Sequence, residues 1–343
     1  YDALLEGFEP GMRVSRLVPV LARLKEGLVP LVAAKAVDAV PEDDRFLHAD
    51  AWDVEKQWAF SLELIRAMGF DLDAGRLDRS AHPFCSGFAP TDVRLTTRLY
   101  RDDGTSAIFS ALHEAGHGLY EQGLPDTFGP LGAAASMGLH ESQSRLWENL
   151  VGRSRAFWTR WFPRLSEHFP AALSGVSLDR WLAAIHRARR SLIRVEADEL
   201  TYNLHILVRF ELELAMLRGD LSVADLPGAW NDAYARTVGI RPPNDAEGVL
   251  QDIHWAWGEL GYFPTYTLGN MYAATLMKGL RRDLPDLDAS IARGDLLPIR
   301  DWLRRHVHAR GWETDAETIV RDATGTGLVE TDLLAHLAAD RTA

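Results

Sequence analysis

The sequence predicts a mostly α-helical fold, built as a single domain over residues 1–343, with one short β element in front of a central helix. Most of the chain repeats apolar side chains at every third or fourth position, which is the spacing of amphipathic helices. Only residues 92–100 alternate polar and apolar side chains, and this period of two is typical of a strand. Hydrophobic residues make up 47% of the 343 positions, enough for a large core, and no internal repeat or flexible linker divides the chain.

The first elements can be placed from the residues at their ends. Asp50 is expected to cap a helix that stops at Gly69, because glycine readily adopts the left-handed conformation that ends many helices. The strand over residues 92–100 follows, and residues 102–104 then turn the chain. A further helix is expected from about Thr105.

Glycine and proline mark the later loops. They gather at residues 123–138, 239–243 and 258–269, where we expect loops. Between the first two of these loops, apolar spacing predicts a long helix over residues 178–217. After the second loop, a helix is expected to begin near Asn244.

Charge, hydropathy and cysteine content exclude several classes of function. Lys and Arg total 37 against 49 Asp and Glu, a net charge of −12, and without a long basic block we expect no nucleic-acid partner. The apolar runs fall short of the roughly 20 residues of a membrane helix, and no secretion signal opens the sequence, so no membrane association is expected. The single Cys85 cannot form an internal disulfide, which favours a reducing, cytoplasmic location.

The strongest chemical signal lies on the helix expected from about Thr105. Residues 113–117 have the sequence HEAGH, and a separation of four places His113 and His117 on one face, one turn apart, where they can share a metal ion. Zinc prefers neutral nitrogen ligands at about 2.1 Å and lowers the pKa of a bound water towards 7. Glu114, beside the pair, is suited to take a proton from that water.

A catalytic zinc site of this kind needs a third protein ligand. The metzincin extension requires glycine at position 120 and histidine at position 123, but the chain has Tyr120 and Gly123, so that class is excluded. Glu141 is the candidate, because it opens a second predicted helix and would complete a His₂Glu site. The alternative is that Glu141 is an acidic residue in the first turn of the helix, whose charge only interacts favourably with the helix dipole. His140 is either a partner of a metal ligand or a polar side chain without a specific role.

Six motifs occur in an order that resembles the carboxypeptidase Taq group, the family 32 metallopeptidases. They are HPF at 82–84, DVRLT at 92–96, HEAGH at 113–117, HESQ at 140–143, IRVEAD at 193–198 and GVLQDIHW at 248–255. Together they span most of the chain, and this makes the resemblance highly specific.

The resemblance implies a zincin-like, mostly helical metallopeptidase whose two lobes enclose a long substrate groove. It implies removal of single amino acids from peptides with a free C-terminus, by an enzyme that is usually a homodimer and uses zinc or sometimes cobalt. Family members carry a helical segment before the equivalent of Tyr1. Because this chain starts at Tyr1, inside a helix predicted over residues 1–8, we expect that the segment has been lost.

A carboxypeptidase must bind a free carboxylate, and an arginine guanidinium matches this group with a planar fork of donors. The resemblance and a polar stripe on the helix predicted over residues 178–217 indicate Arg194 for this role. The ordinary interpretation of the stripe is a solvated face on which Arg194 and Asp198 form an ion pair one turn apart. Arg94, on the predicted strand, is the second choice, and its alternative is a surface position.

His254 falls on the helix expected from Asn244, and the loop expected at residues 258–269 carries Tyr262 and Tyr266. In zinc peptidases of this helical architecture, a histidine and a tyrosine donate hydrogen bonds to the oxyanion of the tetrahedral intermediate. Similar spacing nominates His254 and Tyr266 for this role. Tyr262 is expected either to bind the terminal carboxylate of the substrate or to pack against the loop.

These assignments predict a zinc-dependent metallocarboxypeptidase in which Glu114 is the general base for a metal-activated water. Two other functions remain open at this point. A dipeptidyl carboxypeptidase or an endopeptidase would use the same zinc site, and cleavage of amidated peptides would identify a site that recognises no carboxylate. A catalytically weak peptide-binding fragment would have a structural zinc, although a base beside the metal argues against it.

Overall fold

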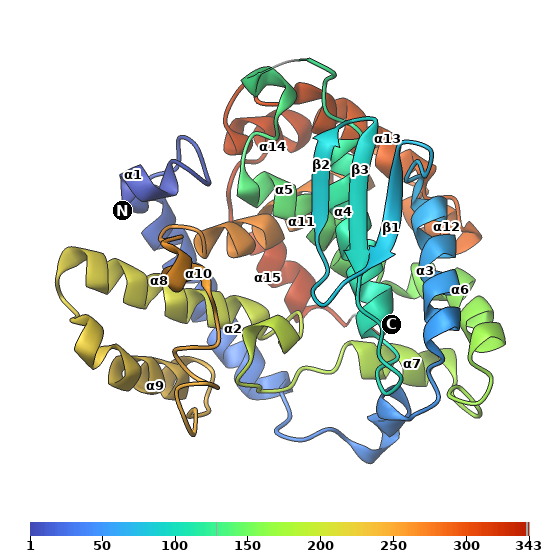
Figure 1. Cartoon of the computed structure of the whole chain (residues 1–343), viewed down its shortest axis with the longest axis horizontal. Helices are drawn as coiled ribbons and strands as arrows, with labels where there is room; N and C mark the ends of the chain where they lie inside the picture. The colour runs from blue at the N-terminus through green and yellow to red at the C-terminus, as the bar shows by residue number, and fades with distance from the viewer. Residues whose placement is uncertain (128, 341, 343) are drawn as a thin grey trace.

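The computed structural model describes residues 1–127, 129–340 and 342, and it confirms a mostly helical fold with a small β element (Figure 1). The α-helices are α1 (Asp2–Leu5), α2 (Val14–Lys35), α3 (Val54–Met68), α4 (Ser106–Glu121), α5 (Met137–Arg145), α6 (Arg155–His168), α7 (Leu178–Ile185), α8 (Tyr202–Arg218), α9 (Leu226–Thr237), α10 (His254–Trp257), α11 (Pro264–Asp283), α12 (Leu287–Arg293), α13 (Leu297–His306), α14 (Ala316–Thr324) and α15 (Thr331–Ala338). The strands are β1 (Gly75–Arg79), β2 (Cys85–Ala89) and β3 (Asp92–Thr97). The short 3₁₀ segments are η1 (Glu42–His48), η2 (Pro130–Gly132), η4 (Arg194–Glu196), η5 (Val223–Asp225) and η6 (His308–Arg310), and η3 (Leu146–Val151) is a π-helix.

The three strands form one mixed sheet that packs on α4. β3 is the central strand, parallel to β1 and antiparallel to β2. Val93 and Leu95 of β3 are fully buried, whereas Arg94 between them is exposed, which explains the alternation in the sequence. The strand ends at Thr97, earlier than the predicted residue 100.

Aspartate side chains accept hydrogen bonds at the starts of α3 and α4, the helices that precede and follow the sheet in the sequence. The Asp103 carboxylate accepts a hydrogen bond of 2.7 Å from the N–H group of Thr105, just ahead of α4. α3 is capped by Asp53, where Asp50 was expected, because the Asp53 carboxylate is the one that accepts from the first free N–H groups. Gly69 ends α3 as predicted, with a φ of 88°.

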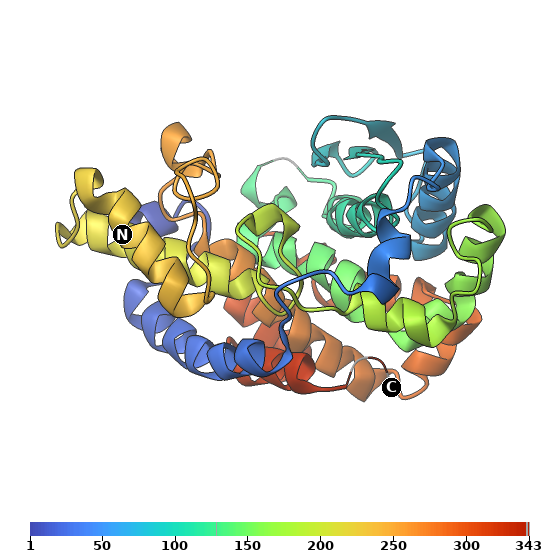
Figure 2. The ribbon, with the colours of Figure 1, turned by 90° about the horizontal axis from the view of Figure 1, so that it is seen from below.

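α5 packs between α4 and α11 at the centre of the molecule (Figure 1). The sheet lies on one side of this centre, and α8 and α9 lie on the other (Figure 2). α2 packs against α8 and α15, so the first long helix of the chain contacts its last helix. No helix in the described part of the chain is long and apolar enough to cross a lipid bilayer.

The prediction of one continuous helix over residues 178–217 is wrong. α7 ends at Ile185 and α8 begins at Tyr202, with only η4 between them. The Asp198 carboxylate accepts a hydrogen bond of 2.9 Å from the N–H group of Leu200. Such a bond competes with helix continuation and instead marks the start of a new helix, α8.

The helix expected to begin near Asn244 is also absent from the described structure. Turns precede the four-residue α10, which starts only at His254. The amide of Gln251 donates to the carbonyl oxygens of Glu247 and Gly248 at 3.1 and 3.2 Å. A side chain that binds these carbonyls takes the place of helical backbone bonds.

The loop expected at residues 258–269 is shorter than predicted. α11 begins at Pro264, whose fixed φ suits the first position of a helix. Tyr262 therefore lies in the loop, whereas Tyr266 lies in the first turn of α11. At the other end of the chain, the helix predicted over residues 1–8 is limited to α1.

A fully buried histidine packs behind the central helices. His308 has its Nε2 atom 2.9 Å from Oε1 of Gln143 and its ring 5.1 Å from that of Tyr120. A Cβ atom on Gly123 would lie 2.5 Å from the imidazole, so glycine at this position leaves room for the ring. Burial lowers the pKa of His308 to about 3, which keeps the imidazole neutral in the folded chain.

We predict that acidification destabilises the fold through His308. An unfolded histidine gains a proton below about pH 6.5, whereas folded His308 stays neutral until about pH 3. The free energy of unfolding should therefore fall by about 2 kcal/mol between pH 6.5 and 5. Urea unfolding of the wild-type chain and of a His308→Gln variant, which keeps a donor towards Gln143, measures this loss. Parallel pH profiles for the two proteins would contradict it.

Candidate metal centre

Two glycines allow the central helices to approach closely. A Cβ atom on Gly116 of α4 would lie 2.6 Å from Cα of Ser144 in α5. A Cβ atom on Gly269 of α11 would lie 2.5 Å from Cγ of Glu141 in α5. Any larger residue at either position would push the helices apart, so glycine sets the spacing of α4, α5 and α11.

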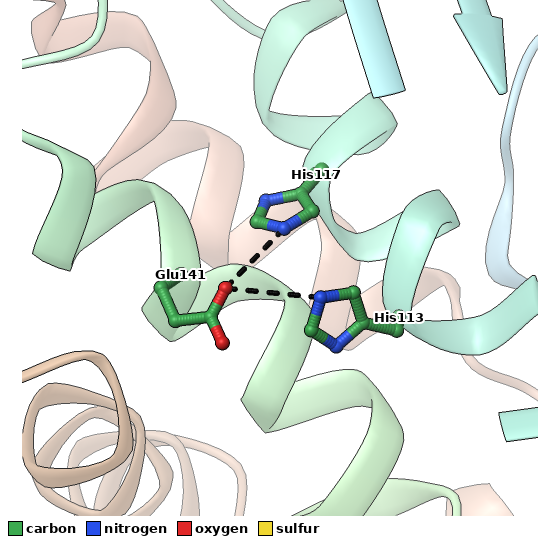
Figure 3. A group of neighbouring side chains, drawn as sticks. All are labelled: His113, His117 and Glu141. Carbon is green, nitrogen blue, oxygen red and sulfur yellow. Dashed lines mark ion pairs between the residues drawn. The ribbon is translucent and has the colours of Figure 1, made fainter. Parts of the chain in front are cut away.

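Three side chains from α4 and α5 point towards one position (Figure 3). Oε2 of Glu141 lies 3.7 Å from Nε2 of His113 and 3.4 Å from Nε2 of His117. A tetrahedral ion with ligand bonds of about 2.1 Å separates its ligands by about 3.4 Å. An acid in the first turn of a helix can serve only the helix dipole, but Glu141 lies beyond the first turn of α5. The group therefore has the spacing and chemistry to hold a divalent metal ion.

The other ring nitrogen of each histidine has a partner of its own. Nδ1 of His113 lies 2.9 Å from Oε2 of Glu148, in η3. Nδ1 of His117 lies 3.1 Å from the carbonyl oxygen of His140 and 2.6 Å from Nδ1 of the same residue. With these Nδ1 atoms protonated, the Nε2 lone pairs face the metal position.

His140 connects His117 to the carboxylate of Glu121. Its Nε2 atom lies 2.7 Å from Oε1 of Glu121, which only accepts when ionised, so His140 Nε2 carries a proton. His140 Nδ1 can then accept a hydrogen bond from the Nδ1–H group of His117. Burial raises the pKa of Glu121, but the bond to His140 outweighs it and lowers the pKa below its ordinary value. Gly87 of β2 provides the space that the Glu121 side chain occupies.

Arg145 holds the third ligand from one turn further along α5. Its Nε atom donates to Oε1 of Glu141 at 2.6 Å, which leaves Oε2 directed at the histidines. Its Nη1 atom donates to Oε2 of Glu148 at 3.0 Å. Arg145 therefore fixes both carboxylates that contact His113.

The ionisation of Glu141 and His117 suits metal binding. At His113, by contrast, burial is outweighed by the charge of Glu141 and the bond to Glu148, which raise the pKa. Burial alone would raise the pKa of Glu141, but the charges of Arg145 and His113 outweigh it and lower the pKa well below its ordinary value. Burial lowers the pKa of His117 to about 4. At neutral pH the group thus offers a carboxylate and a neutral imidazole, the forms that bind a metal.

Glu114 lies on α4, next to the metal ligand His113. It is 6% exposed, and burial raises its pKa to about 7, although His113 opposes the shift. A carboxyl group with a pKa near neutrality is suited to accept a proton and to return it. Burial, together with the charge of Glu114, raises the pKa of the Cys85 thiol, so this cysteine stays protonated.

Arg194 belongs to a second buried cluster of charges. Its Nε and Nη2 atoms lie 2.8 Å from Oδ1 of Asp252, and Arg209 lies 2.6 Å from Oδ2 of the same residue. The three side chains are at most 8% exposed. Two guanidinium groups face one carboxylate, so the cluster has a surplus positive charge.

Tyr202, at the start of α8, joins this cluster to the metal group. Its hydroxyl accepts a hydrogen bond of 3.2 Å from Nη1 of Arg194. The guanidinium of Arg145, which holds Glu141, lies 4.4 Å from the centre of the Tyr202 ring. One aromatic side chain therefore connects the metal ligands with the surplus positive charge.

His254, Tyr262 and Tyr266 lie together, as the sequence suggested. Nε2 of His254 lies 3.1 Å from the hydroxyl of Tyr266, and the Tyr262 ring is 5.3 Å from each of the other two rings. Arg194 lies over the Tyr266 ring at 5.0 Å. Burial and the charge of Arg194 lower the pKa of His254 to about 4, and burial raises the pKa of Tyr266 above its ordinary value. Burial also raises the pKa of Tyr262 to about 12, so all three are neutral at pH 7.

Arg94 occupies a different environment. It lies on the outer face of the sheet, where its side chain is 52% exposed and pairs with Asp92 at 2.9 Å. Its guanidinium also lies 4.9 Å from the ring of Phe88. Within the described residues it makes no hydrogen bond or ion pair with the metal group or with Arg194.

Four residues that support the site were not predicted from the sequence. Arg145 and Glu148 follow Glu141 at spacings of four and seven, so helical periodicity carried a signal for both. Tyr202 follows Arg194 and Asp198 at spacings of four, as the next polar position of the predicted stripe, but it had no predicted role. Glu121 carried no local signal, because its partner His140 comes from another helix.

Known proteins resemble this chain along almost its whole length. The family model described as Carboxypeptidase Taq (M32) metallopeptidase matches residues 1–340. The chain is 51% identical to thermostable carboxypeptidase 1 of Thermus thermophilus, over 98% of this chain and 66% of that protein. It is 45% identical to carboxypeptidase 1 of Bacillus subtilis, over 96% of this chain and 66% of that protein. The chain thus spans about two thirds of the length of these relatives.

Solved structures agree with these matches. An M32 carboxypeptidase from Deinococcus radiodurans superposes with a TM-score of 0.93 at 43% identity, over 98% of this chain and 68% of that one. Metallocarboxypeptidase 1 of Trypanosoma cruzi superposes with a TM-score of 0.89 at 34% identity, over the same shares of the two chains. Because the family model and the solved structures match nearly every residue described above, the chain belongs to the carboxypeptidase Taq (M32) metallopeptidase family.

Proposed function

We propose that the chain is a metal-dependent carboxypeptidase that hydrolyses the C-terminal peptide bond of peptides and releases single amino acids. The observation that carries this proposal is the buried cluster of Arg194, Arg209 and Asp252, which is joined to the metal group through Tyr202. The free carboxylate of a peptide would balance its surplus positive charge, whereas a peptide bond within a chain would not. Family membership and the names of the carboxypeptidase relatives support the same function.

The proposed metal is zinc, held by His113, His117 and Glu141. Cobalt is an expected substitute, because two imidazoles and a carboxylate accept several divalent ions. When bound, zinc would lower the pKa of a water molecule and polarise the carbonyl oxygen of the substrate. The contacts of His140, Glu148 and Arg145 would hold the three ligands in place for this ion.

Glu114 is the proposed general base. Its carboxylate accepts a proton from the attacking water while the water oxygen forms a bond to the carbonyl carbon. The same carboxyl group then returns the proton to the nitrogen of the departing amino acid as the C–N bond breaks. Its pKa of about 7 suits both transfers, because the group neither holds nor rejects the proton strongly at neutral pH.

His254 and Tyr266 are the proposed donors to the oxyanion. Both are neutral at pH 7, so each can offer a hydrogen without adding a fixed charge. In the free protein they share one hydrogen bond of 3.1 Å, in which one donates and the other accepts; this bond keeps the two side chains at one position and must open before both donate to the oxyanion. Donors fixed before the reaction stabilise a developing negative charge most effectively.

The remaining roles concern the substrate. Arg194 would bind the terminal carboxylate, and Tyr262, which lies 5.3 Å from the Tyr266 ring, would contact the last residue of the peptide. Arg94, on the exposed face of the sheet, would contact a part of the peptide further from the bond that is cleaved.

A cytoplasmic location and a homodimer complete the proposal. The first rests on the single cysteine, and the second, which rests on the family resemblance, is tested by the mass measured in sedimentation equilibrium.

The function is tested by incubating the chain with a short unblocked peptide and following the products by mass spectrometry. We expect stepwise loss of single C-terminal residues when zinc or cobalt is present, and no cleavage after treatment with a chelator. Activity should return when the metal is restored. Internal cuts or release of dipeptides would favour an endopeptidase or a dipeptidyl carboxypeptidase, and metal binding without cleavage would favour a peptide-binding fragment.

The role of Glu114 is tested by the isosteric change Glu114→Gln. This variant should bind the metal as tightly as the wild type but lose turnover by a factor of about 10³, because an amide cannot accept the proton of water. Tyr266→Phe is the comparison, since it keeps the base and should lose turnover by about 10² through the missing oxyanion donor. Metal content measured on both variants controls for loss of the ion. Near-normal turnover in Glu114→Gln would exclude the proposed base.

Recognition of the carboxylate is tested with one peptide in two forms, free and amidated at its C-terminus. Arg194→Gln should lower kcat/KM for the free peptide by about 10² and leave the low value for the amide almost unchanged. Arg76→Gln is the matched control, because Arg76 is an exposed arginine of the same sheet that pairs, among the described residues, only with Asp78, and its loss should change both values little. Equal losses on both peptides would show that Arg194 has a structural role only.

A further inference from the structure

The segment that precedes α2 contacts the start of α5, the helix that carries Glu141. The carbonyl oxygen of Phe8 accepts a hydrogen bond of 2.8 Å from the N–H group of Met137, and the Glu9 carboxylate accepts one of 3.0 Å from the N–H group of Gly138. These are the first two N–H groups of α5, which have no partner within the helix itself. A Cβ atom on Gly138 would lie 2.5 Å from the Glu9 carboxylate, so this contact also requires glycine.

Glu9 reaches a second helix of the site at the same time. Its other carboxylate oxygen accepts a hydrogen bond of 3.2 Å from the hydroxyl of Tyr272 in α11. Glu9 is 1% exposed, and its carboxylate lies at the positive end of α5. One buried side chain therefore links the helix that carries Glu141 to the helix that carries Tyr266.

The same segment contacts the loop that carries the proposed substrate residues. The ring of Phe8 lies 5.0 Å from the ring of Tyr262, edge to face. A Cβ atom on Gly261, where φ is 95°, would lie 3.0 Å from the backbone of Leu4 and Leu5. The loop can approach the segment this closely only because residue 261 is glycine.

The segment is also fixed by bonds within itself. The Asp2 carboxylate accepts a hydrogen bond of 2.7 Å from the N–H group of Val14, which closes residues 2–14 into a loop. Glu6 forms an ion pair with Arg13 across the base of this loop. Leu5, inside it, is fully buried. Residues 4–9, which we term the tie, thus have a defined position relative to the rest of the chain.

We propose that Phe8 and Glu9 of the tie are positioning residues, which set the distance between the metal-binding helix α5 and the loop that carries Tyr262. Glu9 acts on the metal side, by holding the start of α5 and hence Glu141. Phe8 acts on the substrate side, through the ring of Tyr262. The second part rests on the proposed carboxypeptidase function, whereas the first part rests only on the metal group.

The experiment measures two properties of the Glu9→Ala and Phe8→Ala variants. Zinc affinity is obtained by competition with a chromophoric chelator, and kcat and KM are obtained with a short unblocked peptide. In Glu9→Ala we expect the zinc dissociation constant to rise about tenfold, at the lower end of the effects seen when a partner of a metal ligand is removed. In Phe8→Ala we expect KM to rise about tenfold while kcat and zinc affinity change less than about twofold.

Leu337→Ala is the control for general loss of stability. Leu337 is fully buried in α15, away from the tie, so this variant should lower the melting temperature without changing zinc affinity or KM. Phe8→Ala is expected to fold, because Glu213 separately holds the loop through Trp255 at 2.9 Å and through Gly261. If Glu9→Ala does not fold, Glu9→Gln replaces it, and its dissociation constant should rise at least about threefold.

The outcomes separate the two parts of the proposal. Unchanged zinc affinity in the folded Glu9 variant would overturn the role of Glu9, and unchanged KM in Phe8→Ala would overturn that of Phe8. Equal effects in Leu337→Ala would overturn both, because they would then reflect stability alone. Zinc titration needs no peptidase activity, so failure of the carboxypeptidase proposal would leave the test of Glu9 intact.

Discussion

The site depends on the close contact of α5 with α4 on one side and α11 on the other. Gly116 and Gly269 permit this contact, since a side chain at either position would overlap with α5. Close packing of helices brings together ligands that come from different parts of the sequence, as Glu141 and the two histidines do. Contact between backbones also leaves little freedom for the side chains that project from them. A metal position with defined spacing can therefore exist before any ion binds.

Burial of charge is the second constraint on this region. Carboxylates and guanidinium groups lie in the interior, where each costs several kcal/mol unless it is paired. Arg145 meets this requirement for Glu141 and Glu148, and Asp252 meets only part of it for Arg194 and its neighbour Arg209. The cluster around Arg145 therefore suits an incoming cation. The cluster around Asp252 has an excess of positive charge. A peptide end and a metal ion thus find complementary charges on the two sides of Tyr202.

Local patterns in the sequence predicted some of these features and missed others for physical reasons. His113 and His117 were predicted because helical periodicity alone sets their separation. The break before α8 was missed because the Asp198 side chain forms bonds to the backbone that override a helical pattern. The pairing of Arg194 with Asp252 joins positions 58 residues apart, so only the packed fold brings them together. The helical class and the central strand could be predicted from periodicity, whereas the ends of elements depended on individual side chains.

The π-helix directly after α5 has a consequence for the length of this region. In η3 the N–H group of Gly152 bonds to the carbonyl oxygen of Trp147, five residues earlier, so this turn holds one residue more than an α-turn. Glu148, which orients His113, lies within this turn. Removal of one residue here would restore an ordinary helix and rotate the preceding part of the helix by about 100° relative to the part beyond the deletion. Deletion of one residue in this turn would therefore disturb the metal group. Exchange of a single apolar side chain here would leave the backbone path unchanged.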